Sequence, residues 1–540
     1  MRIFAEPSSQ CIIDFSPEPP YSILPLKAIT MENTPIPKDT ECQTCRANGF
    51  KVNIKKRLIV CCDGTFSGVD KGTEDYASNV GRLSRTISRV GHDDAGEKIP
   101  QIVYYQSGVG TGSLTYVDKQ RQGAFGGSLA ENVCEAYNFL ASNWGPGDEI
   151  CIFGFSRGAY TARSLAGFIC QVGLLGSGLM DHFFEIYEAY RNRGEKHFTE
   201  TEWAKTLIVP GELGTFPTKE NHYKGTRLEQ IQRYTHPHIT IKVVGVWDTV
   251  GSLQVMNWFG QAGDDTTYHT TKLSPKIENA FHAMAIDEAR GNFPPTLWYL
   301  DRNCLNEDGT PKVNLKQVWF PGYHSDVGGH SKGSIDTNSV DEITFAWMCD
   351  QLHGLVQLDV FALERYILFR LGPTPVQWDL PGKQNIRDLE ARWRQIQWSN
   401  GTLEDNNGWL NGWWIPSLMS TAKASYYRVP GETKVLEDGK KTPIDYRRFN
   451  EEVHPSVHQR VADTKGKYQP TPFRKGWVYV APTETERGHW KKKAGGKEVI
   501  LYEYTIPDPE RMPEKLSREL YHWRGSLERV MAPKEVLAAQ

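Results

Sequence analysis

The sequence contains no long uninterrupted apolar run. A membrane-spanning helix needs a run of about 18 or more apolar residues, and no such run occurs among the 540 residues. The first residues, Met1-Arg-Ile-Phe-Ala-Glu-Pro7, also lack the apolar core of a signal peptide. We therefore expect a soluble protein of the cytoplasm, with no transmembrane segment and at most a peripheral contact with membranes.

A strong charge of one sign is missing as well. The chain has 62 Lys and Arg residues against 65 Asp and Glu residues, for a formal net charge of −3. Such a balance gives no field that would favour nucleic acid, and neither an RRM-like nor a zinc-finger pattern is present. We therefore expect no nucleic-acid partner.

Metal, cofactor and disulfide motifs are scarce. The 10 cysteines are thinly scattered, which suits a reducing compartment better than a disulfide framework. Cys42 and Cys45 form a lone CxxC without the second pair that a structural zinc site needs. The sequence has no His-Glu-x-x-His metal-binding motif. The glycines of residues 108–112 match neither the G-x-G-x-x-G nor the Walker spacing of a phosphate-binding loop. We expect no metal and no cofactor.

The most informative stretch that is present runs from Glu149 to Arg163. A short apolar run, Ile150 to Phe153, leads into Gly154-Phe-Ser156-Arg-Gly158, and Ala159 to Cys170 continues as a predicted helix. A Gly-x-Ser-x-Gly turn between a strand and a helix is typical of a nucleophile elbow, which exposes a serine hydroxyl above a sheet. We interpret Ser156 as a nucleophile.

Strands and helices alternate on both sides of this turn. The pattern predicts a mainly parallel α/β sheet flanked by helices, of the α/β-hydrolase type. The predicted strands are 56–62, 101–105, 150–153, 238–247 and 314–320. The predicted helices are 78–90, with Ser78 as N-cap, and 124–144, 159–170, 280–289 and 341–356.

Three segments lie outside this alternation of strands and helices. Residues 1–54 contain scattered prolines without periodicity and are expected to form a loosely ordered tail before a catalytic domain at 55–356. Residues 178–235 lie between two core strands and are interpreted as a helical cap insertion. Residues 357–540 are expected to be an irregular C-terminal extension that packs on the catalytic domain. Its tryptophans include Trp393, Trp398, Trp409, Trp413 and Trp414.

A serine nucleophile needs a histidine to take its proton and a carboxylate to stabilise the imidazolium. In a parallel sheet, active groups follow the carboxyl ends of strands, in the chain order Ser, acid, His for this fold. Asp248 directly follows the strand that ends at Trp247, and His324 comes four residues after Phe320. These two residues are the predicted acid and base.

Alternatives to both residues remain open. Asp326 is a rival acid, although its place two residues from His324 also suits a role in holding its own loop. His330 lies in the same loop. His454 follows Asp248 in the chain and precedes a turn at Pro455, but no clear strand comes before it. An oxyanion hole is also required, and we expect its backbone donors to be Arg157, Gly64 and Thr65.

These residues resemble those of a known family, the domain of unknown function 2235, which includes the α/β-hydrolase catalytic domain of one class of type VI secretion phospholipase effectors. The resemblance covers about residues 56 to 356, with a departure at Tyr105-Gln-Ser-Gly108, where family members often carry Tyr-Asp-x-Gly. The matching blocks are Val60–Thr65, Ser78–Leu83, Tyr104–Thr111, Gly154–Arg163, Gly245–Val250, Pro295–Trp298 and Trp319–Gly329.

The resemblance implies the same nucleophile, acid and base: Ser156, Asp248 and His324. It also implies a hydrolase that acts on lipid-like esters, although the long chain and proline-rich start are similar to fungal members without a settled substrate. We therefore expect a serine hydrolase that cleaves carboxylic esters through an acyl-enzyme, with a lipid or ester as its partner. Two alternatives are a catalytically silent lipid- or partner-binding protein and an esterase or thioesterase for small soluble substrates.

Overall fold

A computed structural model describes much of the chain from residue 55 onward. Each described residue lies in one compact unit, Cys42–Gln540. The described ranges are 55–64, 77–108, 127–194, 196–209, 211–214, 225–250, 272–290, 293–329, 340–359, 362–363, 398–401, 403, 428–432, 434–437, 440–443, 448–494, 496–507 and 526–540. The predicted tail, Cys42, Cys45, Thr65, His330 and four of the five tryptophans named above fall outside these ranges.

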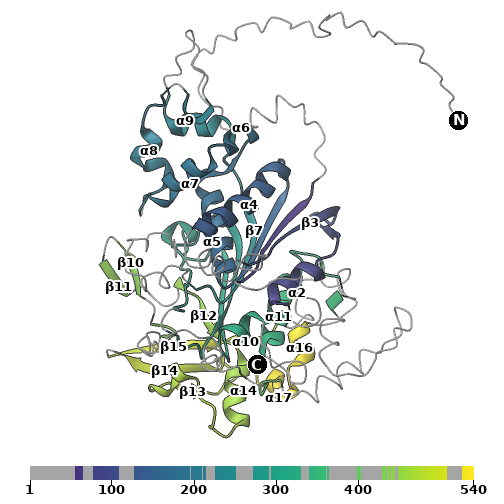
Figure 1. The fold of residues 1–540 in the computed structure, drawn as a ribbon. Helices are drawn as coiled ribbons and strands as arrows, with labels where there is room; N and C mark the ends of the chain where they lie inside the picture. Colours follow the sequence, from purple (N-terminus) through teal and green to yellow (C-terminus); the bar gives the residue numbers. More distant parts are fainter. Residues whose placement is uncertain are drawn as a thin grey trace, which may run out of the picture. The chain divides into compact units, whose positions relative to one another are not determined.

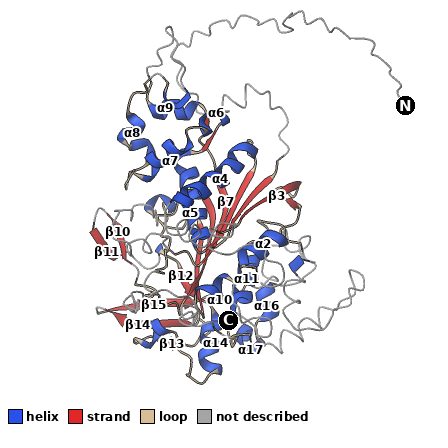
Figure 2. Ribbon diagram, in the orientation of Figure 1, coloured by secondary structure: helices blue, strands red, loops and turns tan. Residues whose placement is uncertain are grey.

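The chain folds around an 11-stranded mixed sheet (Figures 1 and 2). Neighbouring strands follow the order β13-β14-β15-β12-β9-β8-β7-β4-β1-β3-β2. The pairs from β15 to β3 in this order are parallel, and β2, β14 and β13 pair antiparallel with their neighbours at the two ends. This architecture confirms the predicted α/β class with a mainly parallel sheet.

Five of the six central strands match the predicted strands, and β8 is the exception. The six are β1 (Arg57–Cys62), β3 (Lys98–Gln106), β4 (Glu149–Phe155), β7 (Ile241–Trp247), β8 (Ile277–Ala285) and β9 (Asn314–Phe320). The outer strands are β2 (Val90–His92), β12 (Glu451–Val453), β13 (Val478–Val480), β14 (His489–Ala494) and β15 (Lys497–Glu503). Short two-stranded sheets are formed by β5 (Leu174–Leu175) with β6 (Thr235–His236) and by β10 (Lys434–Glu437) with β11 (Lys440–Pro443).

Helices cover both faces of the sheet. Leu58, Val60 and Cys62 point to a core shared with α4 (Gly127–Asn143) and α5 (Arg157–Val172). Ile59 and Cys61 point the other way, toward α2 (Asn79–Thr86) and α11 (Val340–Gln351). This alternation follows from the two-residue period of a strand, and a strand apolar on both sides is what a doubly covered parallel sheet requires. Ser78 caps α2 as predicted, because its Oγ accepts the Gly81 N–H at 3.0 Å.

The predicted helix at 280–289 was wrong. Those residues belong mostly to strand β8, which pairs in parallel with β7 on one side and β9 on the other. Ala280, Ala283 and Ala285 are good helix formers, but each is completely buried. A central strand covered on both faces has no polar alternation, so a short alanine-rich run cannot be separated from a buried helix by its pattern.

The C-terminal region is less irregular than expected. Strand β12 pairs with β9 in parallel, and β15, β14 and β13 continue the same sheet beyond it. Helices described in this region are α14 (Pro455–Asp463), α16 (Leu527–Met531) and α17 (Lys534–Ala538). The sequence pattern missed β12 because a three-residue strand is too short to show periodicity.

Residues 178–235 are mainly helical where the structure describes them. They contain most of α6 (Ser177–Met180), then α7 (Phe183–Arg191), α8 (Glu202–Lys205) and α9 (Arg227–Arg233), with short 3-10 turns at Phe198–Glu200 and Glu212–Gly214. In α7, Phe183, Ile186, Tyr187 and Tyr190 are buried along one side. None of the helices in the described part of the chain has both the length and the apolar character needed to cross a bilayer.

Two glycines let helix α5 pack against the strand ends. A Cβ on Gly158 would lie 2.2 Å from the carbonyl oxygen of Cys62 and 2.4 Å from that of Asp63. A Cβ on Gly154 would lie 2.5 Å from the carbonyl oxygen of Gly158. These neighbours are backbone atoms at the end of β1 and the start of α5, so they cannot move aside as a flexible side chain can. The two glycines of the elbow are therefore required for packing.

We expect Gly158→Ala to lower the free energy of unfolding by about 2–3 kcal/mol, because the added methyl group overpacks a backbone contact. Denaturant unfolding followed by circular dichroism measures this change. Gly178→Ala in α6 is the matched control, since a Cβ there meets no atom within 4 Å. Equal unfolding midpoints for the two variants would contradict this account.

Candidate active site

The ends of four neighbouring strands bring the predicted site residues to one edge of the sheet. Phe155 at the end of β4 is in register with Trp247 at the end of β7, and Ala285 at the end of β8 is in register with Phe320 at the end of β9. Ser156 follows β4 directly, and Asp248 follows β7. His324 begins the short helix α10 (His324–Gly328), just past β9.

Ser156 occupies a strained position between β4 and α5. Its φ of 56° and ψ of −122° are unfavourable for a residue with a side chain. The Ser156 N–H donates to the Trp247 carbonyl oxygen at 3.1 Å, which ties the turn to the neighbouring strand. Strain of this kind at a serine between a strand and a helix is the geometry of a nucleophile elbow.

Ser156, His324 and Asp248 form one hydrogen-bond chain. The distance from His324 Nε2 to Ser156 Oγ is 2.8 Å, and that from His324 Nδ1 to Asp248 Oδ2 is 2.6 Å. An ionised carboxylate only accepts hydrogen bonds, so Nδ1 carries the proton and donates to Asp248. Nε2 is then left to accept the hydrogen bond that the serine hydroxyl donates.

The charges of the hydrogen-bonded Asp248 and His324 depend on burial and on the neighbouring Arg428 cation. Burial alone would raise the pKa of Asp248, but Arg428 and His324 hold it well below the usual value. Burial lowers the pKa of His324, although its hydrogen bond to Asp248 acts in the opposite direction. At neutral pH the site therefore contains an ionised Asp248 and a neutral His324, which can accept a proton.

The backbone around Asp248 is also held in an unusual conformation. Asp248 has a φ of 38°, and its Oδ1 accepts the N–H of Ala285 at 2.9 Å. The next N–H, that of Thr249, donates to Nε2 of His282 at 3.1 Å. His282 is completely buried, and burial lowers its pKa to about 3, so it stays a neutral acceptor. Asp248 is thus fixed in direction by strand β8.

Aromatic rings flank the imidazole of His324, and a second carboxylate holds its backbone. Its ring centroid lies 4.9 Å from that of Phe155 and 5.0 Å from that of Phe293. Its backbone N–H donates to Glu288 Oε2 at 3.2 Å, and Glu288 is paired with Arg290 at 2.8 Å. The ring is therefore positioned by contacts on several sides, and His324 is only about 5% exposed.

The predicted oxyanion donors differ in their placement. Arg157 is the first residue of α5 and directly follows Ser156, so its backbone N–H lies at the positive end of the helix dipole. The N–H of Gly64, in contrast, donates to Asp63 Oδ1 at 2.7 Å. Asp63 also accepts from Ser78 Oγ and from the Tyr105 hydroxyl, both at 2.6 Å. The Gly64 N–H is therefore engaged by Asp63 in this conformation, and its role as an oxyanion donor stays a prediction.

The two rivals are engaged elsewhere. Asp326 Oδ2 accepts the Tyr323 N–H at 2.8 Å and so caps its own short helix. His454 follows strand β12, contrary to the expectation that no strand precedes it, and it caps α14. Its Nε2 lies 3.0 Å from Glu528 Oε1, and burial lowers its pKa to about 3. Neither side chain takes part in the hydrogen-bond chain of Ser156.

One residue that contacts the site could not be predicted from the sequence. Arg428, far along the chain and outside the expected catalytic domain, pairs with both oxygens of Asp248, at 2.5 Å and 2.9 Å. It begins a short described range, 428–432, and no motif surrounds it in the sequence. A search limited to strand ends cannot find such a residue, because long-range tertiary contacts alone bring it to Asp248.

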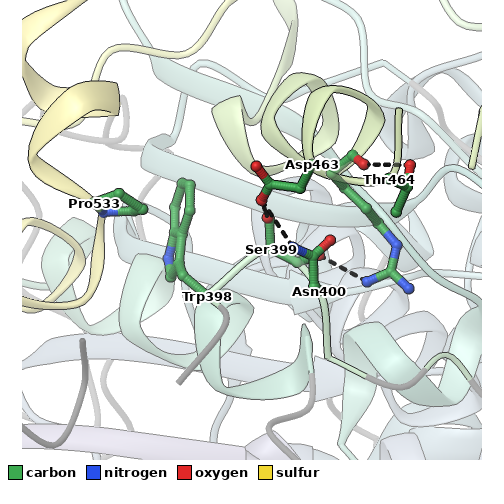
Figure 3. Close-up of a pocket in the computed structure, with 7 residues that line it drawn as sticks. Trp398, Ser399, Asn400, Asp463, Thr464 and Pro533 are labelled. Carbon is green, nitrogen blue, oxygen red and sulfur yellow. Dashed lines mark hydrogen bonds between the residues drawn. The ribbon is translucent and has the colours of Figure 1, made fainter. Parts of the chain in front are cut away.

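A recess of about 620 Å³ lies elsewhere, in the C-terminal region beside α14 (Figure 3). Asp463 accepts hydrogen bonds there from Ser399 Oγ at 2.9 Å and Asn400 Nδ2 at 2.8 Å. Trp398 is the one member of the five tryptophans named above that the structure describes. It forms one wall of this polar recess and does not lie beside Ser156. Within the described ranges, no group of three or more His, Cys, Asp and Glu residues is arranged to hold a metal ion.

Comparisons with known proteins find similarity over parts of the chain. Among curated proteins, the chain is similar to the uncharacterized protein YEL023C of Saccharomyces cerevisiae, with 30% identity over 250 residues. The aligned part covers 44% of this chain and 32% of that protein, so the chain spans about a third of the relative's length.

Two solved structures are also similar to parts of the chain. The Tle1 effector bound to the VgrG spike of the type 6 secretion system matches with 18% identity and a TM-score of 0.25, over 51% of each chain. An uncharacterized protein from Pseudomonas aeruginosa matches with 17% identity and a TM-score of 0.23, over 54% of this chain and 44% of that one. Scores this low do not assign a family, so the assignment depends on the match in sequence.

The family model described as the type VI secretion phospholipase effector Tle1-like catalytic domain matches residues 56–351, more than half of the chain. The matched range begins at β1, ends in α11 and includes Ser156, Asp248 and His324. It confirms the resemblance found in the sequence blocks. The chain therefore belongs to the Tle1-like phospholipase effector catalytic domain family.

Proposed function

We propose that this protein is a serine hydrolase that cleaves carboxylic esters of lipids through an acyl-enzyme. The observation that carries the proposal is the buried hydrogen-bond chain from Ser156 through His324 to Asp248. Those distances are within the reach that proton transfer requires, and the order of the three groups matches the roles of nucleophile, base and acid.

In the proposed acylation step, Ser156 Oγ attacks the ester carbonyl carbon while His324 Nε2 takes the hydroxyl proton. The imidazolium that forms is stabilised by Asp248, whose carboxylate stays ionised and keeps the ring in the productive orientation. His324 then gives the proton to the departing alcohol. The C–O bond to that alcohol breaks, and the acyl group remains on Ser156.

The tetrahedral intermediate carries a negative charge on the former carbonyl oxygen. We assign its stabilisation to the backbone N–H of Arg157 at the start of α5, where the helix dipole adds to the effect. A second donor would require the Gly64 N–H to leave Asp63, or it would come from Thr65. In the proposed second half, water attacks the acyl-enzyme with His324 again as base, and the free acid is released.

A lipid-like substrate is supported by family membership and by the apolar surface of residues 178–235. Phe184, Leu207 and Val209 are each more than half exposed there. Leu207 and Val209 flank the buried Ile208, so in an extended segment they point to the same side. Exposed apolar groups can mark a lipid or partner contact. We propose that these side chains contact the surface of a lipid aggregate.

We expect a fluorophosphonate probe to label the wild-type protein and not the Ser156→Ala variant, because the probe reacts only with an activated serine. Labelling is read by in-gel fluorescence or intact mass. Ser84→Ala is the control, since Ser84 Oγ donates to the Gly81 carbonyl oxygen within α2, away from the site. An unlabelled wild-type protein that still binds vesicles would instead support the catalytically silent alternative.

We expect kcat/KM for a soluble nitrophenyl ester to rise with pH and to reach its plateau before neutral pH. The rise follows deprotonation of His324, and burial lowers the pKa of that residue from its usual value of about 6.5. Activity should therefore be lost as the pH falls through the pKa of His324, and it should be complete at neutral pH. A pH–rate profile with an acid midpoint above neutrality would be inconsistent with this assignment.

We expect the double variant Leu207→Ser, Val209→Ser to hydrolyse phospholipid vesicles about tenfold more slowly, because each lost apolar contact weakens adsorption to the lipid surface. Its rate on a short soluble ester should match wild type. Val478→Ser on β13 is the control, as Val478 is similarly exposed in another part of the chain. A vesicle rate equal to that of wild type would contradict a lipid contact at these two residues.

A further inference from the structure

The carboxylate of Asp248 accepts from four donors, and two of them belong to Arg428. Nη1 of Arg428 donates to Oδ1 at 2.5 Å, and Nη2 donates to Oδ2 at 2.9 Å. The Ala285 N–H and His324 Nδ1 complete the set, at 2.9 Å and 2.6 Å. A carboxylate has about four acceptor positions, so its capacity is used fully. The side chains of Asp248 and Arg428 are both completely buried.

The same guanidinium also binds two backbone carbonyl oxygens. Nη1 donates to that of Ala285 at 2.6 Å, and Nη2 donates to that of Phe293 at 3.0 Å. The ring of Phe293 packs edge-on against the imidazole of His324, with an interplanar angle of 75°. Arg428 therefore connects the acid, the end of strand β8 and an aromatic side chain that flanks the base.

The position of Arg428 in the chain separates it from the rest of the site. The family match ends at residue 351, and Arg428 belongs to the region beyond it, which also supplies strand β12 to the sheet. A buried ion pair contributes little net stability compared with apolar packing, because both charges lose their hydration. A bidentate pair does, however, fix the direction of a carboxylate.

We propose that Arg428 is a positioning residue of this site, supplied by the C-terminal region, which holds Asp248 ionised and directs its Oδ2 at His324. The proposal rests on the proposed function of Ser156. Arg428 acts through Asp248, since its guanidinium donates to the acid and to two backbone carbonyl groups. The hydrolase domain is thereby completed by a residue from outside the range that defines its family.

Removal of the Arg428 guanidinium should change the apparent pKa of the Asp248–His324 pair in a predictable direction. With Arg428 present, the ionised acid and neutral base are balanced by the guanidinium. Without it, the buried pair of Asp248 and His324 keeps an uncompensated negative charge and binds a proton more readily, so its apparent pKa rises. The other described charged or titratable groups that face the pair are Glu288, Arg290 and the neutral His282. All three residues are kept in the variant, although the loss of Arg428 also removes a charge that lowers the pKa of Glu288 and of His282.

The test compares Arg428→Met with Arg428→Lys in the full chain, by the rate of fluorophosphonate labelling and by kcat/KM for a soluble ester over the whole accessible pH range. We expect Arg428→Met to move the acid midpoint upward by about one to two pH units. Its activity at neutral pH should fall about 10- to 100-fold and recover partly in alkali. Arg428→Lys keeps the charge, so its midpoint should stay near that of wild type, with a loss that does not depend on pH.

Arg448→Met is the matched control. Arg448 is another arginine of the C-terminal region, and its Nε donates to the carbonyl oxygen of Leu300. We expect this variant to keep the wild-type midpoint. If Arg428→Met does not fold, the Asp248→Asn variant with and without Arg428→Met provides the second measurement. A residue that acts through Asp248 should change the rate by less than about threefold once that carboxylate is absent.

The possible results distinguish a failure of the Arg428 proposal from a failure of the proposed function. A folded Arg428→Met protein with the wild-type midpoint, or with wild-type activity, would overturn the role of Arg428 and leave the nucleophile assignment intact. So would a further large loss when Arg428→Met is added to Asp248→Asn. A wild-type protein that resists labelling would overturn the proposed function itself.

Discussion

The site depends on keeping one carboxylate ionised in the interior of the protein. Asp248 has no access to water, and burial of a charge without partners is among the most costly events in folding. Its oxygens are satisfied by the N–H of Ala285, the imidazole of His324 and the guanidinium of Arg428. These donors come from a strand, a short helix and the C-terminal region. All three must assemble before the acid can hold its charge.

The sheet makes that assembly possible. The parallel strands β4, β7, β8 and β9 end at one edge, so residues separated by up to 168 positions, such as Ser156 and His324, meet within hydrogen-bond distance. The strain at Ser156 is maintained by close packing of helix α5 against the end of β1, where Gly158 leaves no room for a side chain. A rigid edge of this kind lets the hydroxyl and the imidazole keep their relative position without reorganisation.

Sequence patterns predicted the parts of this arrangement that are local. The elbow was evident because a serine flanked by glycines is typical of a nucleophile when it lies between a strand and a helix. Asp248 and His324 were found because parallel strands collect active groups at their carboxyl ends. Strand β8 was mistaken for a helix because complete burial removes the polar alternation that identifies a strand. Strands β12 and β13 were missed because three-residue strands carry little periodic signal, and the longer strands β14 and β15 were not predicted either.

Local pattern and chain order were enough to predict the fold class and the three residues that meet at the edge of the sheet, and the resemblance of several sequence blocks indicated the family. Which groups surround those residues became evident only in the folded chain. Folding places Arg428 on Asp248, gives the Gly64 N–H to Asp63 and pairs His454 with Glu528. These contacts join residues through packing rather than through spacing or motif, and the charge of a buried group depends on all its neighbours at once.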